Sequence, residues 1–410
     1  MHATIALSAT AQHYLDLEEQ YGAHNYHPLP VVLNRGEGVY VYDVDGKRYF
    51  DFLSGYSAVN QGHCHPKIIA SLVEQAQKLT LTSRAFHSNV LGEYEKYITA
   101  YFGYDKVLPM NTGVEAVETA LKLSRRWGYS VKGIQQDKAK IVVCAQNFHG
   151  RTTGVISFST DITATHDFGP FLNGFEIIPF NDLKALEKSL QDKNVCAFLF
   201  EPIQGEAGVV VPHDDYYKGI RTLCDEYNVL MVADEIQTGL ARTGTMLACD
   251  AENVKPDILI LGKALSGGVL PVSAVLANNH IMLTIKPGEH GSTYGGNPLA
   301  CAVAITALQV LKDEGMMQNA YAMGKILRDE LQKLNSSFIT AIRGRGLLNA
   351  IVINHPNPEA AWDLCLHMKE LGLIAKPTHG DKIRFAPPLV INETQILECI
   401  SIIDKSLQML

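Results

Sequence analysis

Short runs of large apolar residues recur between helical stretches in the middle of the chain. The runs are Lys140–Cys144, Cys196–Phe200, Val229–Ala233 and Ile258–Leu261. An uninterrupted apolar run of this length is typical of a strand that is buried on both faces. Helical stretches separate some of the runs, at Asp182–Leu190 and Tyr216–Tyr227. The alternation predicts an α/β fold with a mostly parallel sheet, and the irregular spacing argues against a barrel.

Two of these runs end in a charged residue. Ile258–Leu261 leads through Gly262 to Lys263, and Val229–Ala233 leads to Asp234. If the two strands are neighbours, both side chains project into one pocket at the carboxyl edge of the sheet, where open sheets bind ligands. A lysine can form a Schiff base with an aldehyde, and a carboxylate can keep a pyridinium nitrogen protonated. Pyridoxal phosphate (PLP) needs both groups, although each charge alone also suits a solvated strand end.

A second feature suits a phosphate. The small polar loop Met110–Gly113 opens a helix that continues to about Trp127. Backbone amides at a helix start bind phosphate well. Glu115 in the first turn also favours the helix start by itself, so this feature alone is a weak indication.

Composition excludes several classes of protein. A length of 410 residues predicts two domains. The net charge of −8, without a basic stripe, argues against nucleic-acid binding. No apolar stretch approaches the roughly 18 residues that span a bilayer, so we expect no membrane association. Residues 1–12 lack Lys and Arg and resemble no targeting peptide. We therefore expect a cytoplasmic protein, with a processed mitochondrial chain as the open alternative.

The eight cysteines are scattered and form no CxxC pair. We interpret them as free, mostly buried thiols in a reducing compartment. His63-Cys64-His65 has three potential metal ligands in a row. Adjacent residues rarely converge on one metal, and no distant partner motif is visible, so we expect no metal site.

The two ends of the chain differ from its middle. A helix is expected at His13–Tyr21, a loop at Tyr21–Pro30 and a β-hairpin around Asp45-Gly46. Val272–Ala277 is an expected strand that follows Lys263 without a helix and so can run antiparallel. From about residue 312, helices and strands mix as in a small α+β domain. We expect an N-terminal segment (1–46) that packs on the small domain or at a dimer interface, a large domain (47–311) and a small domain (312–410).

Three motifs point to one family when they are read together. They are Asp234–Gly239, Leu261–Gly268 and Gly291–Pro298. In this order they resemble the motifs of the class III ω-aminotransferases, which are PLP enzymes of fold type I. The resemblance covers nearly the whole chain. It implies a large domain built on a mostly parallel seven-stranded sheet, a smaller α+β domain, and PLP as the cofactor.

The resemblance assigns roles around the cofactor ring. Lys263 is expected to hold PLP as an imine and, once substrate displaces it, to carry the proton between the substrate carbon and the cofactor. Asp234 would pair with the pyridinium nitrogen and make the ring an electron sink. Gln237 would bind the phenolic oxygen, and Phe148 would stack on the ring.

The phosphate is assigned to two subunits. The resemblance implies that the amides of Gly113 and Val114 bind it, together with Ser292 and Thr293 of the partner subunit. We therefore expect a homodimer with shared active sites.

Four further stretches resemble the members of the class that act on L-ornithine and 2-oxoglutarate. They are Tyr21–Pro30, Tyr56–Pro66, Phe148–Thr153 and Glu201–Gly208. The implied reaction gives glutamate, and glutamate 5-semialdehyde that cyclises to pyrroline-5-carboxylate. Acetylornithine and 4-aminobutyrate are the alternative amino donors within the class.

The same resemblance assigns the substrate contacts. Arg151 would bind the α-carboxylate of ornithine, Tyr26 would lie near its α-amino group, and Tyr56 would shape the pocket. Arg384 would grip 2-oxoglutarate, and Glu206 would mask Arg384 while ornithine is bound. An ordinary ion pair between Glu206 and Arg384 is equally consistent with the sequence. A contact to a free α-amino group argues against acetylornithine and 4-aminobutyrate.

The sequence disfavours two other classes of protein. A non-catalytic PLP-binding regulator is disfavoured because every expected catalytic position is intact. An NAD-dependent oxidoreductase is disfavoured because Gly344–Asn349, the nearest approach to a dinucleotide fingerprint, lacks the third glycine and precedes a strand.

Overall fold

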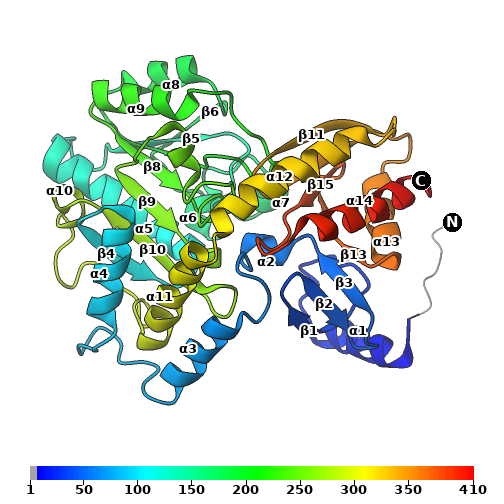
Figure 1. The fold of residues 1–410 in the computed structure, drawn as a ribbon. Helices are drawn as coiled ribbons and strands as arrows, with labels where there is room; N and C mark the ends of the chain where they lie inside the picture. Colours follow the sequence, from blue (N-terminus) through cyan, green and yellow to red (C-terminus); the bar gives the residue numbers. More distant parts are fainter. Residues whose placement is uncertain (1–6) are drawn as a thin grey trace.

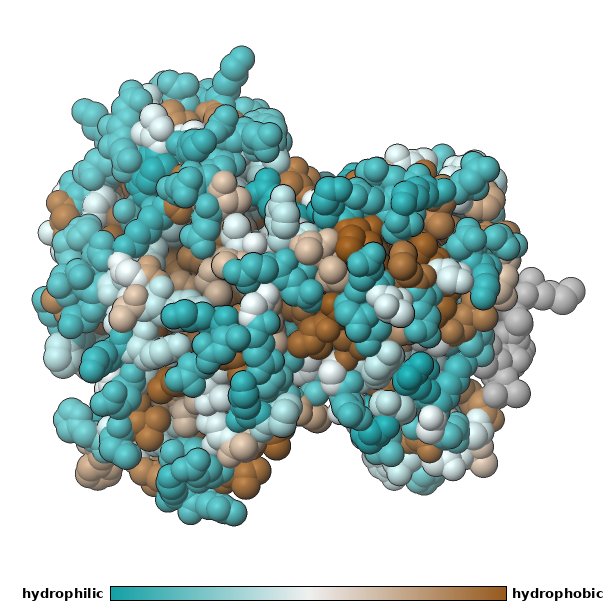
Figure 2. All heavy atoms as spheres, in the orientation of Figure 1, coloured by the Kyte–Doolittle hydropathy of each residue, from teal (hydrophilic) through white to brown (hydrophobic). Residues whose placement is uncertain are grey.

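The computed structural model describes residues 7–410, which form a large lobe and a smaller lobe (Figure 1). The first six residues of the expected N-terminal segment lie outside the described part. Figure 2 shows the two lobes in the same orientation, with a constriction between them and a mostly hydrophilic surface.

The large lobe is built on a seven-stranded sheet within the described residues. In spatial order its strands are β4 (Lys106–Met110), β10 (Ser273–Ala277), β9 (Ile258–Leu261), β8 (Leu230–Asp234), β7 (Val195–Phe200), β5 (Lys140–Cys144) and β6 (Phe175–Ile178). β10 pairs antiparallel with both β4 and β9, and the pairs from β9 to β6 are parallel. The expected fold class and the antiparallel strand after Lys263 are confirmed.

Helices cover both faces of this sheet (Figure 1). The longer ones are α3 (Pro66–Ala76), α4 (Leu91–Phe102), α5 (Gly113–Trp127), α8 (Leu183–Leu190), α9 (Tyr216–Glu226) and α11 (Pro298–Asp313). Short helical pieces are α2 (Ser54–Ser57), α6 (Thr153–Ile156), α7 (Ile162–Thr165), α10 (Asn279–Met282) and turns at Gly128–Lys132, Ala248–Glu252 and Lys263–Ser266. Along β8, Leu230 and Val232 pack in the core that contains α5, whereas Met231 and Ala233 pack in the core that contains α9. Burial on both faces explains why the central runs are apolar at every position.

Sequence patterns missed two strands, β4 and β6, and both lie at the edges of the sheet. β4 contains Pro109, and an edge strand tolerates a residue that cannot donate a ladder hydrogen bond. β6 contains Glu176 and the exposed Ile177. Edge strands therefore lack the continuous apolar run by which the central strands were found.

The small lobe contains a second, antiparallel sheet. Its strands are β11 (Ile339–Arg345), β12 (Leu348–Ile353), β15 (Lys382–Phe385) and β14 (Lys376–Thr378). Its helices are α12 (Met316–Lys333), α13 (Ala360–Glu370) and α14 (Glu393–Leu407), and α12 packs against β11 and α14. The hairpin of β14 and β15, which the sequence patterns also missed, carries Arg384.

The N-terminal segment joins the small lobe through a third sheet. The segment contains α1 (Ala9–Tyr21), β1 (Leu33–Glu37) and β2 (Tyr40–Asp43). β3 (Arg48–Asp51), just beyond residue 46, pairs with β2 and also in parallel with β13 (Leu373–Ile374). The expected hairpin is present, with Gly46 at a φ of +85° in its turn. α1 begins four residues before the expected position because Ser8 caps it by accepting a hydrogen bond from the Ala11 N–H.

Across residues 7–410, we find no helix that has both the length and the hydropathy needed to cross a bilayer.

Candidate active site

Lys263 and Asp234 meet at the carboxyl edge of the large sheet. β8 and β9 are parallel neighbours, so their ends lie side by side. Both residues line a cavity of about 250 Å³, which we call the inner cavity. Its lining residues are Gly113, Val114, Phe148, His149, Gly150, Glu201, Ile203, Glu206, Asp234, Ile236, Gln237, Thr238 and Lys263. Six residues that the resemblance assigned to the cofactor thus share one cavity.

The Lys263 amine suits nucleophilic chemistry. Burial lowers the pKa of Lys263 to about 8, even though the nearby carboxylate of Glu206 acts in the opposite direction. A substantial fraction of the amine is therefore neutral near physiological pH, and only the neutral amine attacks an aldehyde. The backbone at Lys263 has a φ of +44°, a left-handed conformation that is uncommon for a residue with a side chain. Such local strain is frequent at active sites.

Asp234 is 5% exposed, and its carboxylate contacts a buried histidine. Oδ2 of Asp234 lies 2.6 Å from Nδ1 of His149, and Oδ1 accepts a hydrogen bond of 3.1 Å from the Ile236 N–H. Burial acts to lower the pKa of His149, but the hydrogen bond and charge of Asp234 outweigh it and raise that pKa. Nε2 of His149 has no hydrogen-bond partner among residues 7–410. Asp234 is thus held in a fixed orientation while its negative charge faces the cavity.

Two residues that line the inner cavity, His149 and Glu201, lie in stretches quoted in the sequence analysis but received no role there. Oε1 of Glu201 accepts a hydrogen bond of 2.8 Å from the Phe148 N–H and so holds the loop whose aromatic ring borders the inner cavity. Burial raises the pKa of Glu201 to about 7. A signal was available, because Glu201 follows the buried strand β7 just as Asp234 ends β8. For His149, the only sequence signal was its position next to Phe148.

The N-terminus of α5 has two amides available at the inner cavity. Thr112 and Glu115 form a capping box, in which the carboxylate of Glu115 accepts hydrogen bonds from the N–H groups of Asn111 and Thr112 at 3.1 Å and 2.8 Å. Gly113 and Val114 are the first residues of the helix, so their N–H groups have no partner one turn earlier. Glu115 therefore satisfies the amides outside the helix and leaves these two for an anion.

Arg384 and Glu206 form an ion pair between the lobes. The guanidinium donates two hydrogen bonds, from Nη1 to Oε1 at 2.6 Å and from Nη2 to Oε2 at 3.3 Å. Burial acts to raise the pKa of Glu206, but the Arg384 guanidinium outweighs it and lowers that pKa to about 2. Gln237 also donates a hydrogen bond of 3.3 Å to Oε1 of Glu206. The Arg384 guanidinium lies 4.9 Å from the ring centre of Tyr56.

The remaining predicted site residues do not line the inner cavity. Arg151 is exposed, and its guanidinium lies 5.6 Å from the ring centre of Phe148. Tyr26 is 70% exposed on the N-terminal segment. Thr293 is exposed, and Ser292 accepts a hydrogen bond of 2.7 Å from the side chain of Asn111.

The residues of the inner cavity fit PLP. An amine with a lowered pKa faces the cavity together with a buried carboxylate, and two helix-terminal amides are available for a phosphate. Phe148 offers an aromatic face at the same cavity. This donor set matches the aldehyde, the ring nitrogen, the phosphate and the ring plane of the cofactor.

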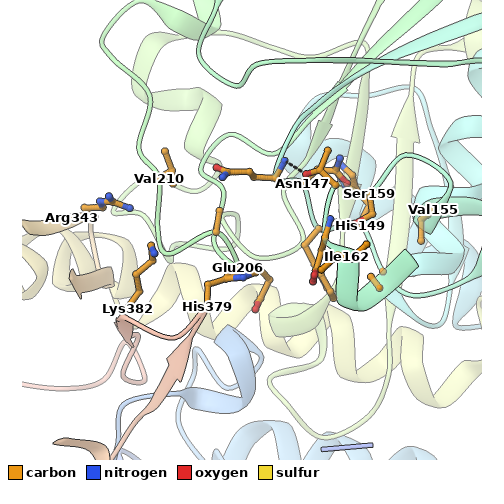
Figure 3. A pocket seen from close by; sticks show the side chains of 17 residues that line it. Asn147, His149, Val155, Ser159, Ile162, Glu206, Val210, Arg343, His379 and Lys382 are labelled. Carbon is orange, nitrogen blue, oxygen red and sulfur yellow. Dashed lines mark hydrogen bonds between the residues drawn. The ribbon is translucent and has the colours of Figure 1, made fainter. Parts of the chain in front are cut away.

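A larger cavity of about 610 Å³ adjoins the inner one and shares four residues with it, Phe148, His149, Gly150 and Glu206. We call it the outer cavity. Figure 3 shows Arg343, His379 and Lys382 of the small lobe on its wall together with Asn147, His149 and Ser159 of the large lobe. It therefore lies between the two lobes, next to the inner cavity.

The histidines of the His63–His65 stretch make separate carboxylate contacts. Nε2 of His63 lies 2.7 Å from Oδ2 of Asp51, and Nε2 of His65 lies 3.1 Å from Oε2 of Glu314. Cys64 is exposed and the other seven cysteines are buried, and all eight are free.

Comparison with known proteins places this geometry in a family. The model of the class III aminotransferases matches residues 21–407, and the chain belongs to that family. The match confirms the expected enzyme class, an aminotransferase that depends on PLP. The chain is 64% identical over 398 residues to the mitochondrial ornithine aminotransferase of Rattus norvegicus, covering 97% of this chain and 91% of the relative.

Solved structures agree on the fold. The ornithine aminotransferase of Toxoplasma gondii, described with partial occupancy of PLP at its active site, superposes with a TM-score of 0.96 at 48% identity and covers 97% of this chain and 94% of its own. The acetylornithine aminotransferase of Elizabethkingia anophelis superposes with a TM-score of 0.90 at 57% identity and covers 98% and 99%. Enzymes that are named for two different amino donors, ornithine and acetylornithine, therefore share this fold. The fold alone does not identify the amino donor, so the side chains around the cavity must distinguish the two.

Proposed function

We propose that this aminotransferase transfers the δ-amino group of L-ornithine to 2-oxoglutarate. The products are glutamate 5-semialdehyde, which cyclises to pyrroline-5-carboxylate with loss of water, and glutamate. The observation that carries the proposal is the ion pair of Glu206 and Arg384 beside Lys263. An enzyme that alternates between a diamine and a dicarboxylate needs an arginine for the second substrate that is neutralised while the first is bound. The name of the rat relative supports the same substrate.

The chain's own residues would supply positioning and proton transfer. PLP, when bound, withdraws electrons from the substrate carbon that carries the amino group. The Lys263 amine lies in the inner cavity, where it would hold the cofactor and then move the proton at that carbon. Asp234, oriented by His149, would keep the ring nitrogen protonated. Gln237 would bind the phenolic oxygen, Phe148 would cover the ring, and the amides of Gly113 and Val114 would bind the phosphate.

The first half-reaction requires ornithine to enter with its δ-amino group foremost. Arg151, close to Phe148 at the rim of the inner cavity, would bind the α-carboxylate. Tyr26 would contact the α-amino group, and Tyr56 would shape the wall beside Arg384. With its carboxylate on Arg384, Glu206 would prevent that arginine from attracting the α-carboxylate of ornithine, which would present the wrong amino group.

The second half-reaction requires Arg384 to be free. 2-Oxoglutarate carries two carboxylates, and the planar fork of Arg384 matches one of them with two hydrogen bonds. Glu206 would leave Arg384 when this acceptor enters. Arg384 is 2% exposed, so little water competes for the released guanidinium.

One experiment tests the reaction and its regiochemistry together. The holoenzyme is mixed with ornithine in the absence of a keto acid, the visible absorbance of the bound cofactor is followed, and pyrroline-5-carboxylate is trapped. We expect the band to bleach and the trapped product to form. Bleaching without that product would contradict δ-transfer and leave an aminotransferase of other specificity.

Acetylornithine and 4-aminobutyrate are the competing donors, and the Elizabethkingia anophelis structure makes the first of them worth a direct test. Both lack a free α-amino group for Tyr26. In competition assays we expect ornithine to be preferred, and Tyr26→Phe to reduce kcat/KM for ornithine more than for acetylornithine. A preference of the unmodified enzyme for acetylornithine would overturn our choice.

We also propose a homodimer with shared active sites. Thr293 and the neighbouring Tyr294, which is 57% exposed, give the loop at Ser292 surface that a second subunit can cover. Mixing Lys263→Ala subunits with Ser292→Ala/Thr293→Ala subunits would test this. Each variant alone should be inactive or weak. A hybrid dimer should have about half of the wild-type activity, because one of its two sites carries neither defect, so an equal mixture in which about half of the dimers are hybrids should regain about a quarter. No recovery in hybrids of proven dimeric mass would contradict shared sites.

The cytoplasm is the compartment that we propose, although the rat relative is named as mitochondrial. Free cysteines suit either reducing compartment. Fractionation of the source cells with an antibody against the chain would decide.

A further inference from the structure

Glu206 is a boundary residue between two cavities. Its side chain lines the inner cavity that contains Lys263 and also the outer cavity between the lobes. Figure 3 shows Glu206 between the cavity side that carries Lys382 and the side that carries His149. A carboxylate that leaves Arg384 therefore has an adjoining space to enter.

A second cation borders that space on the strand that carries Arg384. Lys382 and Arg384 are two residues apart on β15, so their side chains leave the same face of the strand about 7 Å apart. The stem of Lys382 lies against the turn that follows Glu206, because a Cβ placed on Gly208 would lie 2.2 Å from Cδ of Lys382. Lys382 lines the outer cavity and not the inner one.

The backbone of Glu206 is fixed to the same hairpin. The hydroxyl of Thr378 donates a hydrogen bond of 3.0 Å to the carbonyl oxygen of Glu206. The guanidinium of Arg343 donates one of 3.3 Å to the carbonyl oxygen of Gly208. With its backbone anchored at both places, Glu206 can change partner by rotating its side chain while the loop stays in position.

We propose that the carboxylate of Glu206, when it leaves Arg384 for a dicarboxylate, turns into the outer cavity and pairs with the ammonium group of Lys382. This inference rests on the proposed function, in which Glu206 masks Arg384. Lys382 is then a positioning residue that stabilises the open state of Arg384 and contacts neither cofactor nor substrate. The open state binds dicarboxylate, so Lys382 sets the affinity for 2-oxoglutarate and leaves ornithine binding unchanged.

Asp381 competes for the same ammonium group. Its carboxylate pairs with Lys382 in the present structure and is about half exposed. When Glu206 arrives, Lys382 exchanges one carboxylate for another. Removing the charge of Asp381 should therefore favour the open state, and removing the charge of Lys382 should disfavour it.

The test measures binding of glutarate, an unreactive dicarboxylate, to the holoenzyme by calorimetry. Lys382→Met keeps the stem against Gly208 and removes the charge, and we expect it to raise the Kd for glutarate about fivefold. Asp381→Asn should lower that Kd about twofold to threefold. Lys405→Met, an exposed lysine on α14, is the matched control and should leave the Kd unchanged.

A double-variant cycle separates this role from a general charge effect. In Glu206→Gln the carboxylate that Lys382 stabilises is absent, so adding Lys382→Met should change the Kd by less than about twofold. If Lys382→Met has its full effect in that background, or none in the wild type, the proposal is wrong. If Lys382→Met does not fold, the Kd for glutarate can be measured with Lys382→Gln and Asp381→Asn instead, and the same changes are expected. Pyrroline-5-carboxylate trapping with ornithine tests the proposed function separately, because glutarate binding does not depend on the amino donor.

Discussion

The guanidinium of Arg384 holds the carboxylate of Glu206 with two hydrogen bonds, although 178 residues separate them in the chain. The pair lies between the two lobes, and Glu206 lines the same cavity as Lys263. A diacid that enters this cavity must compete with an internal carboxylate for one arginine.

Replacing Glu206 with Gln removes the charge that masks Arg384. We expect tighter binding of 2-oxoglutarate and a loss of about tenfold in kcat/KM for ornithine, since Arg384 would then attract the α-carboxylate. Ornithine bound in that orientation yields pyrroline-2-carboxylate, so the ratio of the two cyclic products reports the error. Glu93→Gln, at an exposed position on α4, is the control. Unchanged regiochemistry and an unchanged KM would show that the ion pair is only structural.

Arg384→Lys keeps a positive charge but loses the planar fork. We expect the KM for 2-oxoglutarate to rise about 10-fold to 100-fold, equivalent to about 1.4–2.7 kcal/mol, while the ornithine half-reaction changes little. Stopped-flow measurement of the two half-reactions separates these effects. Equal losses in both would contradict a role that is confined to the second substrate.

Asp234→Asn preserves the shape of the side chain and removes its charge. We expect kcat to fall at least about 100-fold, because the ring nitrogen of the cofactor would lose its anionic partner. The pKa of His149 should fall as well, since the charge of Asp234 raises it in the native protein. NMR titration of His149 provides a readout that is independent of activity. A retained kcat would contradict the role proposed for Asp234.

The lowered pKa of Lys263 predicts how the apoenzyme takes up PLP. Only the neutral amine attacks the aldehyde, so the rate of uptake should rise with pH and level off above about 8. An ordinary lysine would continue to gain reactivity up to about pH 10.4. Absorbance-monitored reconstitution of the apoenzyme between pH 6 and pH 10 tests this, with a free alkylamine as the reference for titration of PLP itself. A midpoint near 10 would contradict an active-site amine of lowered pKa.

Glu235 predicts a dependence of stability on pH. Its carboxylate is fully buried, accepts hydrogen bonds from the Cys249 N–H at 2.9 Å and from the Thr238 hydroxyl, and burial raises its pKa to about 7. The native state therefore keeps a proton that the unfolded state releases above about pH 4.3, and stability falls as pH rises from there to about 7. The loss of stability over this pH range amounts to about 4 kcal/mol.

Glu235→Gln should remove the part of the pH dependence of stability that Glu235 causes. Urea unfolding at pH 5 and pH 8 should show a smaller difference in the free energy of unfolding for the variant than for the wild type. Burial also raises the pKa of Glu201 to about 7. Glu201 therefore lowers the free energy of unfolding over the same pH range, and part of the pH dependence should remain in the variant. An identical pH dependence in variant and wild type would exclude Glu235 as its source.

Much of the central sheet could be predicted because its strands are buried on both faces. Lys140–Cys144 and Ile258–Leu261 have the same bounds in the structure as in the sequence prediction. β6, at a sheet edge, and β15, in the small lobe, were missed because neither presents the long apolar run by which the central strands were found. Missing β15 also hid the spacing of Lys382 and Arg384 on one strand face.

Within the site, the chemistry available at the sheet edge follows from the order of residues along the chain. A buried strand must end where its apolar run ends, so the side chains of Lys263 and Asp234 had to emerge at the edge that binds ligands. Which charges meet depends on how distant segments pack in three dimensions. His149 contacts Asp234 and Glu206 contacts Arg384 because separate segments pack at one junction, and contacts over such sequence distances depend on how the lobes close around the cavity rather than on any local pattern.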